Sequence, residues 1–372
     1  SSRGIVNFLE VIKTSVAMLL EAGAQPFVVP GMGSHGGATV EGQTAVLADT
    51  HGITEASVGC PIRATMDVVQ VGTTESGFPV YQDKLCYEAD GVLVVNRVKP
   101  HTGFTEVVES GLAKMLVIGL GKQAGASRIH QQALRIDMGQ MILDASKIIV
   151  EADRPRLIGG LALVENAFKE TAKVCAVSLD THAALVAAES QLLKQAYELL
   201  PRLPFADIDV LIVDEIGKNI SGSGMDTNVI GRKPGLTSPT IQCIYVRGLT
   251  EETHGNGTGI GHADLIPRSM FDELDLHSTY MNAYTAKKLL VGKIPMLVES
   301  ELQAMQVFGG FREGADPASL RAVWIKNTSK LEEMWASSAL LEEAEAGNDI
   351  EVLSAPAPVV FDGDSNMQLP PT

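Results

Sequence analysis

Three histidines and one lysine in the first half of the chain have side chains suited to acid–base or covalent chemistry. They are His35, His101, Lys114 and His130. Imidazole has an ordinary pKa of about 6.5, so a histidine can both accept and donate a proton near neutral pH. A buried lysine amine must be paired, deprotonated or used in a covalent bond. These residue types predict an enzyme.

His35 lies in a loop that is rich in glycine. The loop follows an apolar run at 27–30 and reads Gly31-Met32-Gly33-Ser34-His35-Gly36-Gly37. Four glycines allow the backbone to approach a ligand and to point N–H groups at it. A helix that begins near Thr39 would add a partial positive charge. We expect this loop to bind a cofactor through Gly33 and Ser34; the alternative is a tight turn with a solvated histidine.

His101 and Lys114 each lie beside an apolar run that predicts a strand. His101 follows the run at 92–96, and Pro100 fixes the backbone just before it. Lys114 precedes Met115–Gly119, which we interpret as a buried strand. The alternatives are a surface loop with a basic flank for His101 and, for Lys114, a buried stem whose amine reaches water.

A second group of glycines, Gly119, Gly121 and Gly125, precedes the helix that carries His130. The order strand, glycines, helix is typical of dinucleotide binding, but the spacing differs from G-x-G-x-x-G. In addition, no acidic residue ends a following strand about 20 residues on. We interpret the group as a weak nucleotide- or phosphate-binding signal. An NAD(P)-dependent dehydrogenase is the alternative enzyme that would use it.

The second half of the chain has one loop dense in glycine and polar residues, at 217–232. Its Lys218, Asn228 and Arg232 suit an anionic substrate. A second polar stretch, at 277–283, either lines the same cleft or begins a helix, because Ser and Thr are good N-caps.

Apolar runs of strand length alternate with helical patterns, which predicts an α/β fold. A chain of 372 residues is long enough for two domains. We expect mostly parallel sheets flanked by helices, with the active site in the interdomain cleft. The linker is predicted at 200–204, where two prolines stop the preceding helix. The predicted parts are a cofactor-binding catalytic domain at 1–200, a substrate-closing domain at 205–354 and an extended tail at 355–372.

Strands are predicted at 26–30, 91–96, 115–119, 157–164, 174–179, 207–216, 240–246, 294–298, 321–326 and 351–354, and helices at 39–49, 123–151, 183–200, 264–274, 300–306 and 329–345.

The composition is that of a folded globular protein, with 45% hydrophobic and 20% charged residues. A net charge of −16 argues against nucleic acid or an anionic membrane as a partner. The four cysteines form no C-x-x-C pair, which argues against a disulfide scaffold or a structural zinc site. There is no signal peptide pattern and no apolar run of about 18 residues, so we expect a cytoplasmic protein. Because the chain begins at Ser1 without Met, we also expect residues upstream to be missing.

The types and spacings of His35, His101, Lys114 and His130 resemble those of the nickel-pincer-dependent lactate racemase family. The glycine-rich context of the first histidine and the Pro-His context of the second add to the resemblance. The segment Ser2-Arg3-Gly4 looks like the end of the family's early Asp-x-x-Arg segment. The resemblance covers most of the chain and is most specific in residues 1–135.

The resemblance implies a racemase or epimerase that inverts C2 of a small 2-hydroxy acid or sugar acid by reversible hydride transfer. Lys114 would bind a nickel-pincer nucleotide covalently through a thioamide, and His130 would ligate the nickel. His35 and His101 would form the acid–base pair, and Arg3 would help to hold the substrate. The enzymes that synthesise the cofactor are then the implied partners.

The sequence departs from the family pattern in two places. Three more residues than expected lie between His101 and Lys114, and residues 105–110 replace the family's aromatic–glycine run. The family's Tyr-Gln and Lys substrate contacts have no match in the second half, so Lys218, Asn228 and Arg232 are the candidates to replace them. Two further alternatives are a non-catalytic metabolite-binding protein on the same fold and a zinc hydrolase, although no H-E-x-x-H motif supports the latter.

Overall fold

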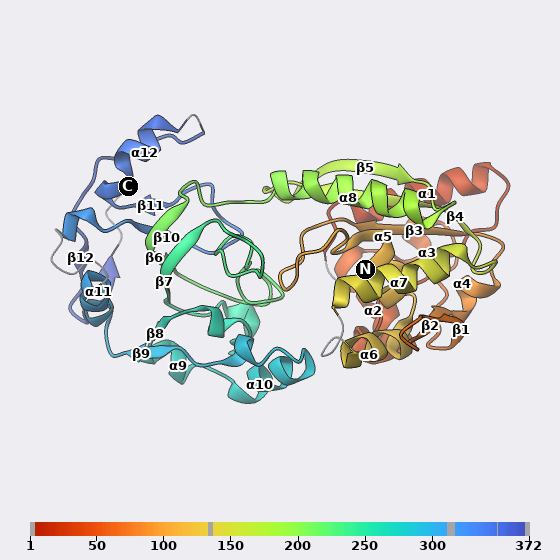
Figure 1. The fold of residues 1–372 in the computed structure, drawn as a ribbon, viewed down its shortest axis with the longest axis horizontal. Coiled ribbons are helices and arrows are strands. Elements are labelled where there is room, and N and C mark those ends of the chain that lie inside the picture. The colour runs from red at the N-terminus through yellow and green to blue at the C-terminus, as the bar shows by residue number, and fades with distance from the viewer. Residues whose placement is uncertain (1–3, 133–136, 311–316, 348, 369–372) are drawn as a thin grey trace. The chain divides into compact units, whose positions relative to one another are not determined.

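The computed structural model describes residues 4–132, 137–310, 317–347 and 349–368 (Figure 1). The chain divides into two compact units, Ser1–Leu200 and Pro201–Thr372. Helices and sheets alternate in both, so the predicted α/β class is confirmed. Within the described ranges, no helix has both the length and the apolar character needed to cross a membrane.

The first unit contains a three-stranded sheet with helices on both faces. Its strands are β3 (Val92–Arg97), β4 (Leu157–Glu165) and β5 (Thr171–Val177); β4 pairs parallel with β3 and antiparallel with β5. Along β4, Ala162 and Leu163 belong to different hydrophobic clusters, because successive residues of a strand point to opposite faces. A separate hairpin joins β1 (Val68–Thr73) to β2 (Pro79–Asp83).

Eight α-helices surround these strands in the described part of the first unit. The cluster that contains Ala162 includes buried residues of α5, α7 and α8, whereas the cluster that contains Leu163 includes residues of α1, α2 and α3. The helices are α1 (Phe8–Glu21), α2 (Val40–His51), α3 (Glu55–Val58), α4 (Lys84–Glu88), α5 (Gly111–Lys114), α6 (Lys122–Gln132), α7 (Met138–Glu151) and α8 (His182–Glu198).

Two strands predicted in this unit are wrong. Met115–Gly119 is a π-helical turn, η2, that continues α5, and the N–H of Leu120 donates to the carbonyl of Met115 at 2.8 Å. A short buried apolar run fits a buried helix as well as a buried strand, so periodicity alone could not separate them. The run at 26–30 forms only an isolated bridge between Val28 and Ile62, because a proline at each end has no N–H for a ladder.

The second unit contains a six-stranded sheet in the order β11-β10-β6-β7-β8-β9. Neighbours from β10 to β9 are all parallel, and β11 is antiparallel to β10. The strands are β6 (Asp207–Val213), β7 (Thr240–Val246), β8 (Leu265–Pro267), β9 (Met296–Val298), β10 (Ala322–Ile325) and β11 (Trp335–Ala336), and the α-helices are α9 (Arg268–Asp272), α10 (Leu276–Thr285), α11 (Glu301–Gly310) and α12 (Leu341–Ala346).

Three predictions for the second unit differ from the structure. The predicted helix at 264–274 begins with β8, and only α9 is helical within it. The predicted helix at 329–345 contains β11, and α-helix begins only at Leu341. No strand forms at 351–354. In each case the local apolar or charged pattern is short. Pairing and packing with distant segments then decide the backbone conformation, and they override the local preference.

The segment after Ala355, expected to be an extended tail, contains a small hairpin. Its strands are β12 (Val360–Phe361) and β13 (Met367–Gln368), which pair antiparallel. Met367 is 2% exposed and packs in the cluster that includes Trp324 of β10. This buried methionine fixes the hairpin to the second unit.

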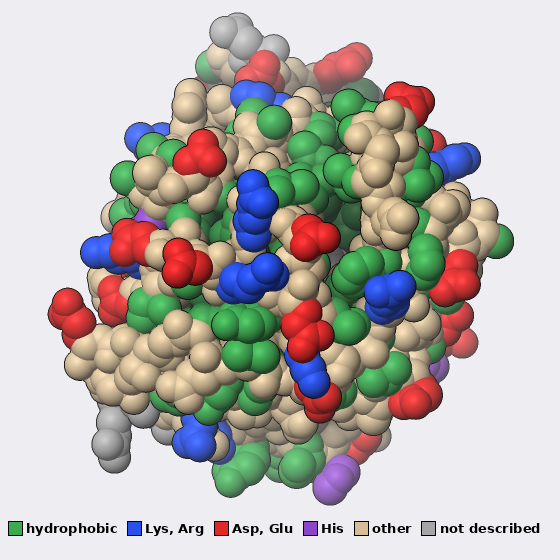
Figure 2. All heavy atoms as spheres, turned by 90° about the vertical axis from the view of Figure 1, so that its right-hand side faces the viewer, with side chains coloured by type: hydrophobic (Ala, Val, Ile, Leu, Met, Phe, Trp, Pro, Cys, Tyr) green, Lys and Arg blue, Asp and Glu red, His purple; other side chains and the backbone are tan. Residues whose placement is uncertain are grey.

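Charge is dispersed over the face drawn in Figure 2. Acidic and basic side chains are interspersed among neutral ones there, rather than gathered in one patch. The net charge of −16 therefore does not concentrate on this face.

Candidate active site

The glycine-rich loop that carries His35 lies against η2. The N–H of Gly33 donates to the carbonyl of Gly119 at 3.0 Å. Gly33 has φ +60°, and a Cβ there would lie 3.0 Å from the carbonyl oxygen of Ile118. Only glycine suits such a left-handed conformation at so close an approach. The loop therefore holds exposed His35 beside the segment that directly follows Lys114.

A buried lysine, Lys122, holds this loop through hydrogen bonds inside the first unit. Its Nζ, which is 0% exposed, donates to the carbonyl of Pro30 at 2.7 Å and to Oε1 of Gln43 at 3.0 Å. It also pairs with the buried Asp83 at 3.1 Å. Gln43 in turn donates to the carbonyls of Gly33 at 2.9 Å and His35 at 3.2 Å. One buried amine thus connects the start of the loop directly, and its middle through Gln43, to Asp83 at the end of β2.

These contacts correct the interpretation of the second glycine group as a phosphate signal. The helix α6 follows the π-helical turn η2 and not a strand, so the order that a dinucleotide site requires is missing. The amine of Lys122, which would otherwise suit a phosphate, is directed at protein groups. The structural context thus removes the support for an NAD(P)-dependent dehydrogenase.

We expect Lys122→Met to destabilise the protein strongly, because it leaves the Asp83 carboxylate buried without its ion-pair partner. Removing one partner of a buried pair costs about 3–5 kcal/mol in the free energy of unfolding. Urea denaturation measures the loss, and Lys84→Met is the matched control because Lys84 is exposed. If the two variants were equally stable, Lys122 would not have this role.

His101 and Lys114 lie on the same aromatic ring. The imidazole of His101 stacks on Phe104, with ring centroids 4.2 Å apart and an angle of 30° between the planes. Nζ of Lys114 lies over the same ring, 5.8 Å from its centroid. The structure therefore brings an imidazole and a primary amine, 13 positions apart in the sequence, to one local site.

A backbone hydrogen bond orients the His101 ring. The N–H of Gly103 donates to Nδ1 of His101 at 2.9 Å. The neutral ring in this arrangement carries its proton on Nε2, an assignment that follows from the donor at Nδ1. A neutral ring bonded in this way can donate a proton from Nε2.

The segment 105–110, which departs from the family pattern, supplies the groups that hold the His101 loop. Glu109 is 1% exposed, and its Oε2 accepts the N–H of His101 at 2.7 Å. Its Oε1 accepts the hydroxyl of Tyr197 at 2.9 Å. Ser110 bonds both the N–H and the carbonyl of Lys99, at 2.7 and 2.6 Å. Glu109 and Ser110 of this segment thus position the loop that carries His101.

A buried carboxyl group of α8 holds the short helix that ends at Lys114. Glu189 is 1% exposed and accepts the N–H groups of Leu112 and, at 3.2 Å, Ala113. Gly111 has φ +83°, and a Cβ there would lie 2.0 Å from Oε1 of Glu189. The carboxyl group therefore satisfies free N–H groups in the first turn of α5, whose last residue is Lys114.

The pKa of Glu189 gives a pH prediction. Burial raises the pKa of the carboxyl group from 4.5 to about 8, although its bonds from Leu112 and Ala113 act in the opposite direction. The folded state therefore binds the proton more tightly than the unfolded state. The stabilising contribution is full below about pH 4.5 and is lost as the pH rises through about 8.

We expect the free energy of unfolding of the native protein, relative to Glu189→Gln, to fall between about pH 5 and about pH 9. The amide of the variant does not titrate, so the difference isolates this carboxyl group. Urea denaturation across this pH range is the measurement. Identical pH dependence in the two proteins would contradict the raised pKa.

The predicted substrate-binding residues of the second unit all have partners. Nζ of Lys218 donates to Oδ1 of Asn282 at 2.5 Å, and Arg232 pairs with Asp264 at 3.1 Å. Asn228 donates to Asp226 at 2.8 Å, while its own Oδ1 is buried and no donor in the described residues reaches it.

The polar stretch at 277–283 lies in α10. The N-cap of this helix is Asp275, whose side chain accepts the N–H of Ser278. The interpretation of its Ser and Thr residues as the N-cap is therefore wrong: Asp275 caps the helix, and the stretch lies within it. Because Asn282 of α10 also contacts Lys218, the stretch lies beside the loop at 217–232 as well.

Several predicted residues remain untested by this geometry. Arg3 and the side chain of His130 lie outside the described residues, although the backbone of His130 is in α6. Among the side chains that are described, no group of three His, Cys, Asp or Glu residues is arranged to hold a metal ion. The residues that the sequence predictions missed are Phe104, Glu109, Tyr197 and Glu189 with Leu112 and Ala113, and Lys122 with Asp83 and Gln43.

One of the missed residues had a visible signal. Glu189 lies on the buried face of α8 with Leu185, Leu192, Leu193 and Ala196. A charged residue at a helical position that the pattern assigns to the core needs a partner inside the protein. Lys122 and the Tyr197 partner of Glu109 had no such signal, because their contacts join segments distant in sequence.

Comparison with known proteins adds two similarities. Residues 4–167 match a family described as a domain of unknown function (DUF362). No curated protein matches the chain. The structure is similar to that of the lactate racemase apoprotein from Thermoanaerobacterium thermosaccharolyticum, with a TM-score of 0.50 and 12% sequence identity, covering 81% of this chain and 79% of that one. The protein therefore has a lactate racemase-like fold.

Proposed function

We propose that the protein is a racemase or epimerase that inverts C2 of a small 2-hydroxy acid or sugar acid. The observation that carries the proposal is the shared position of His101 and Lys114 on the Phe104 ring. The glycine-rich loop of His35 lies against the turn that follows Lys114. The lactate racemase-like fold supports the same reaction type.

The chemistry of the substrate explains why two imidazoles would be needed. The C2 proton of a 2-hydroxy acid is very weakly acidic, so direct deprotonation by a side-chain base is unfavourable. Removing hydride from C2 while a base takes the hydroxyl proton gives a planar keto acid. Hydride can then return to the other face. Because the substrate hydroxyl occupies a different position before and after inversion, His35 and His101 would each serve one enantiomer.

The nickel-pincer nucleotide that the sequence resemblance implies fits the described residues in two respects. Lys114 offers a half-buried amine at the end of a helix that Glu189 holds. The loop that contains Gly33 and Ser34 continues to Gly37, which is exposed, has φ +65° and has open space where a Cβ would lie, so a ligand can approach the backbone there. Lys114 would hold the group covalently and His130 would ligate its nickel. When bound, it would supply a hydride acceptor.

The substrate carboxylate would be held by cationic and amide side chains. Arg3, Lys218, Asn228 and Arg232 are the candidates. Because Lys218 and Arg232 have Asn282 and Asp264 as partners, they would exchange these partners for the carboxylate. A guanidinium group binds a carboxylate through two parallel hydrogen bonds, so Arg232 would also fix its orientation.

The proposal includes a cytoplasmic location and a dependence on cofactor-synthesis enzymes. All four cysteines are free thiols, as is usual in a reducing compartment. No other macromolecular partner is proposed.

An inversion screen tests the proposed function. Protein produced together with cofactor-synthesis enzymes would be incubated with single enantiomers of 2-hydroxy acids and sugar acids, and the products separated by chiral chromatography. We expect at least one substrate to be inverted. Protein produced without those enzymes is the control and should be inactive. Absence of inversion, of nickel and of added mass on the Lys114 peptide would together overturn the proposal.

A further inference from the structure

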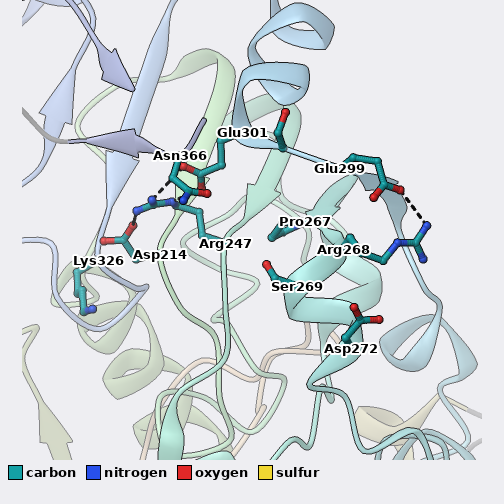
Figure 3. A pocket seen from close by; sticks show the side chains of 11 residues that line it. Asp214, Arg247, Pro267, Arg268, Ser269, Asp272, Glu299, Glu301, Lys326 and Asn366 are labelled. Atoms are coloured by element: carbon teal, nitrogen blue, oxygen red, sulfur yellow. Dashed lines mark hydrogen bonds and ion pairs between the residues drawn. The ribbon is translucent and has the colours of Figure 1, made fainter. Parts of the chain in front are cut away.

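The second unit has a polar cavity that none of the proposed racemase residues lines. Its volume is about 690 Å³, within the range of about 300–1,000 Å³ for small-molecule sites. Figure 3 shows Ser269 and Asp272, both on α9, on one side of the cavity. Arg247 and Lys326 lie on the other side.

The cavity lies at the carboxyl ends of five parallel strands. Asp214, Arg247, Arg268, Glu299 and Lys326 directly follow β6, β7, β8, β9 and β10, respectively, and all five line it. The chain places β7, β8 and β9 on one side of β6 and then returns to place β10 on the other. The strand order therefore reverses beside β6. Ligands of open α/β sheets bind at such reversals, outside the carboxyl ends of the strands.

The central cation of the cavity is fixed in advance. Arg247 donates to Glu301 through Nε at 2.5 Å and through Nη2 at 3.1 Å, and to Asp214 through Nη1 at 2.7 Å. Its guanidinium also lies over the Trp324 ring, 4.7 Å from the centroid. Trp324 donates to the same Asp214 oxygen at 2.7 Å. These contacts form a rigid polar wall whose geometry a ligand need not rearrange.

The lining chemistry selects among ligand classes. Four carboxylates and three cations face the cavity together with two serines and one asparagine, and Pro267 is the single apolar residue among them. This near balance of charge disfavours both a polyanion and an organic polycation, and the lack of apolar side chains disfavours a lipid or aromatic ligand. A hydroxyl group, however, donates to a carboxylate and accepts from a cation or amide at once.

We propose that this cavity is a binding site for a neutral, hydroxyl-rich ligand, namely a sugar or polyol. Ser269 and Asp272 lie at one wall, where their side chains have access to the ligand's hydroxyl groups. Asp272 accepts from these groups. On the opposite side lie Arg247, which keeps its bonds to Glu301 and Asp214, and Lys326, which pairs with Glu215 at 3.3 Å and can also donate to a ligand oxygen. The site is separate in its residues from the racemase proposal, so either can fail without the other.

Saturation-transfer difference NMR on the full chain tests the site. The probes are glucose, mannose, xylose, sorbitol and myo-inositol at millimolar concentration, with inorganic phosphate and citrate as anionic comparisons. We expect at least one neutral probe to bind and neither anion to displace it. Asp272→Asn should weaken binding about tenfold, because a charged acceptor is lost. Ser269→Trp should also weaken binding, because the indole occupies the part of the cavity beside Asp272.

Two control variants complete the experiment. Asp90→Asn changes an exposed carboxylate of the first unit and should leave binding unchanged. His101→Ala should also retain binding, which separates this site from the proposed active site. The proposal is overturned if no neutral probe binds, if phosphate or citrate displaces the bound probe, or if both cavity variants bind as well as the native protein.

Discussion

Lys114→Arg is expected to abolish inversion and to leave the corresponding peptide without added mass. Arginine keeps the positive charge over Phe104, but its guanidinium stays protonated and does not serve as an amine nucleophile. Activity should fall to the level of protein made without cofactor-synthesis enzymes. Peptide mass spectrometry and chiral chromatography on the same preparation measure both effects.

Lys84→Arg is the matched control for this variant. Lys84 is exposed at the start of α4, so the same substitution there should change neither activity nor cofactor attachment. Full activity of Lys114→Arg would remove Lys114 from the proposed site. If Lys114→Arg lost activity but its residue-114 peptide still carried the added mass, attachment would not need an amine. The proposed thioamide bond to Lys114 would then be wrong.

His101→Asn is expected to lower kcat by about 10²–10⁴ while leaving cofactor attachment intact. A positioned acid–base group contributes this much to rate. The asparagine oxygen takes a position close to Nδ1 and can still accept the N–H of Gly103, so the loop should keep its conformation. Steady-state kinetics in both directions, with nickel content determined in parallel, measure the effect.

The control for the histidine variant is His254→Asn. His254 is exposed and has φ +50°, a conformation that asparagine adopts readily. It should retain native kinetics. If His101→Asn were equally active, the imidazole on Phe104 would have no role in proton transfer. If it lost nickel together with activity, its role would lie in binding the cofactor.

The fold was largely predictable because its strands have strong apolar patterns. Strands β6 and β7 are almost entirely buried, and their parallel pairing agrees with the mostly parallel sheet that the apolar runs predict. The errors occurred where a pattern was short. Met115–Gly119 is five residues long, and whether it becomes a strand or a π-helical turn depends on what packs against it.

The sequence predicted the reactive side chains of the candidate site but not the residues that position them. His101 and Lys114 attracted notice because their side chains are reactive, and the structure shows them on one ring. The groups that hold them, Glu109 and Glu189, act through hydrogen bonds to backbone N–H groups, and those of Glu189 lie far away in sequence. Such bonds leave no spacing pattern. Convergence with the His130 side chain stays a prediction.

The most direct test of the proposed mechanism follows the hydrogen atom at C2. A single enantiomer of an inverted substrate, deuterated at C2, would be converted by the cofactor-loaded protein and the product analysed by mass spectrometry. If hydride leaves C2 and returns to the opposite face, the inverted product retains deuterium in ordinary water. Complete replacement of deuterium by solvent hydrogen would show proton abstraction instead and would contradict the account.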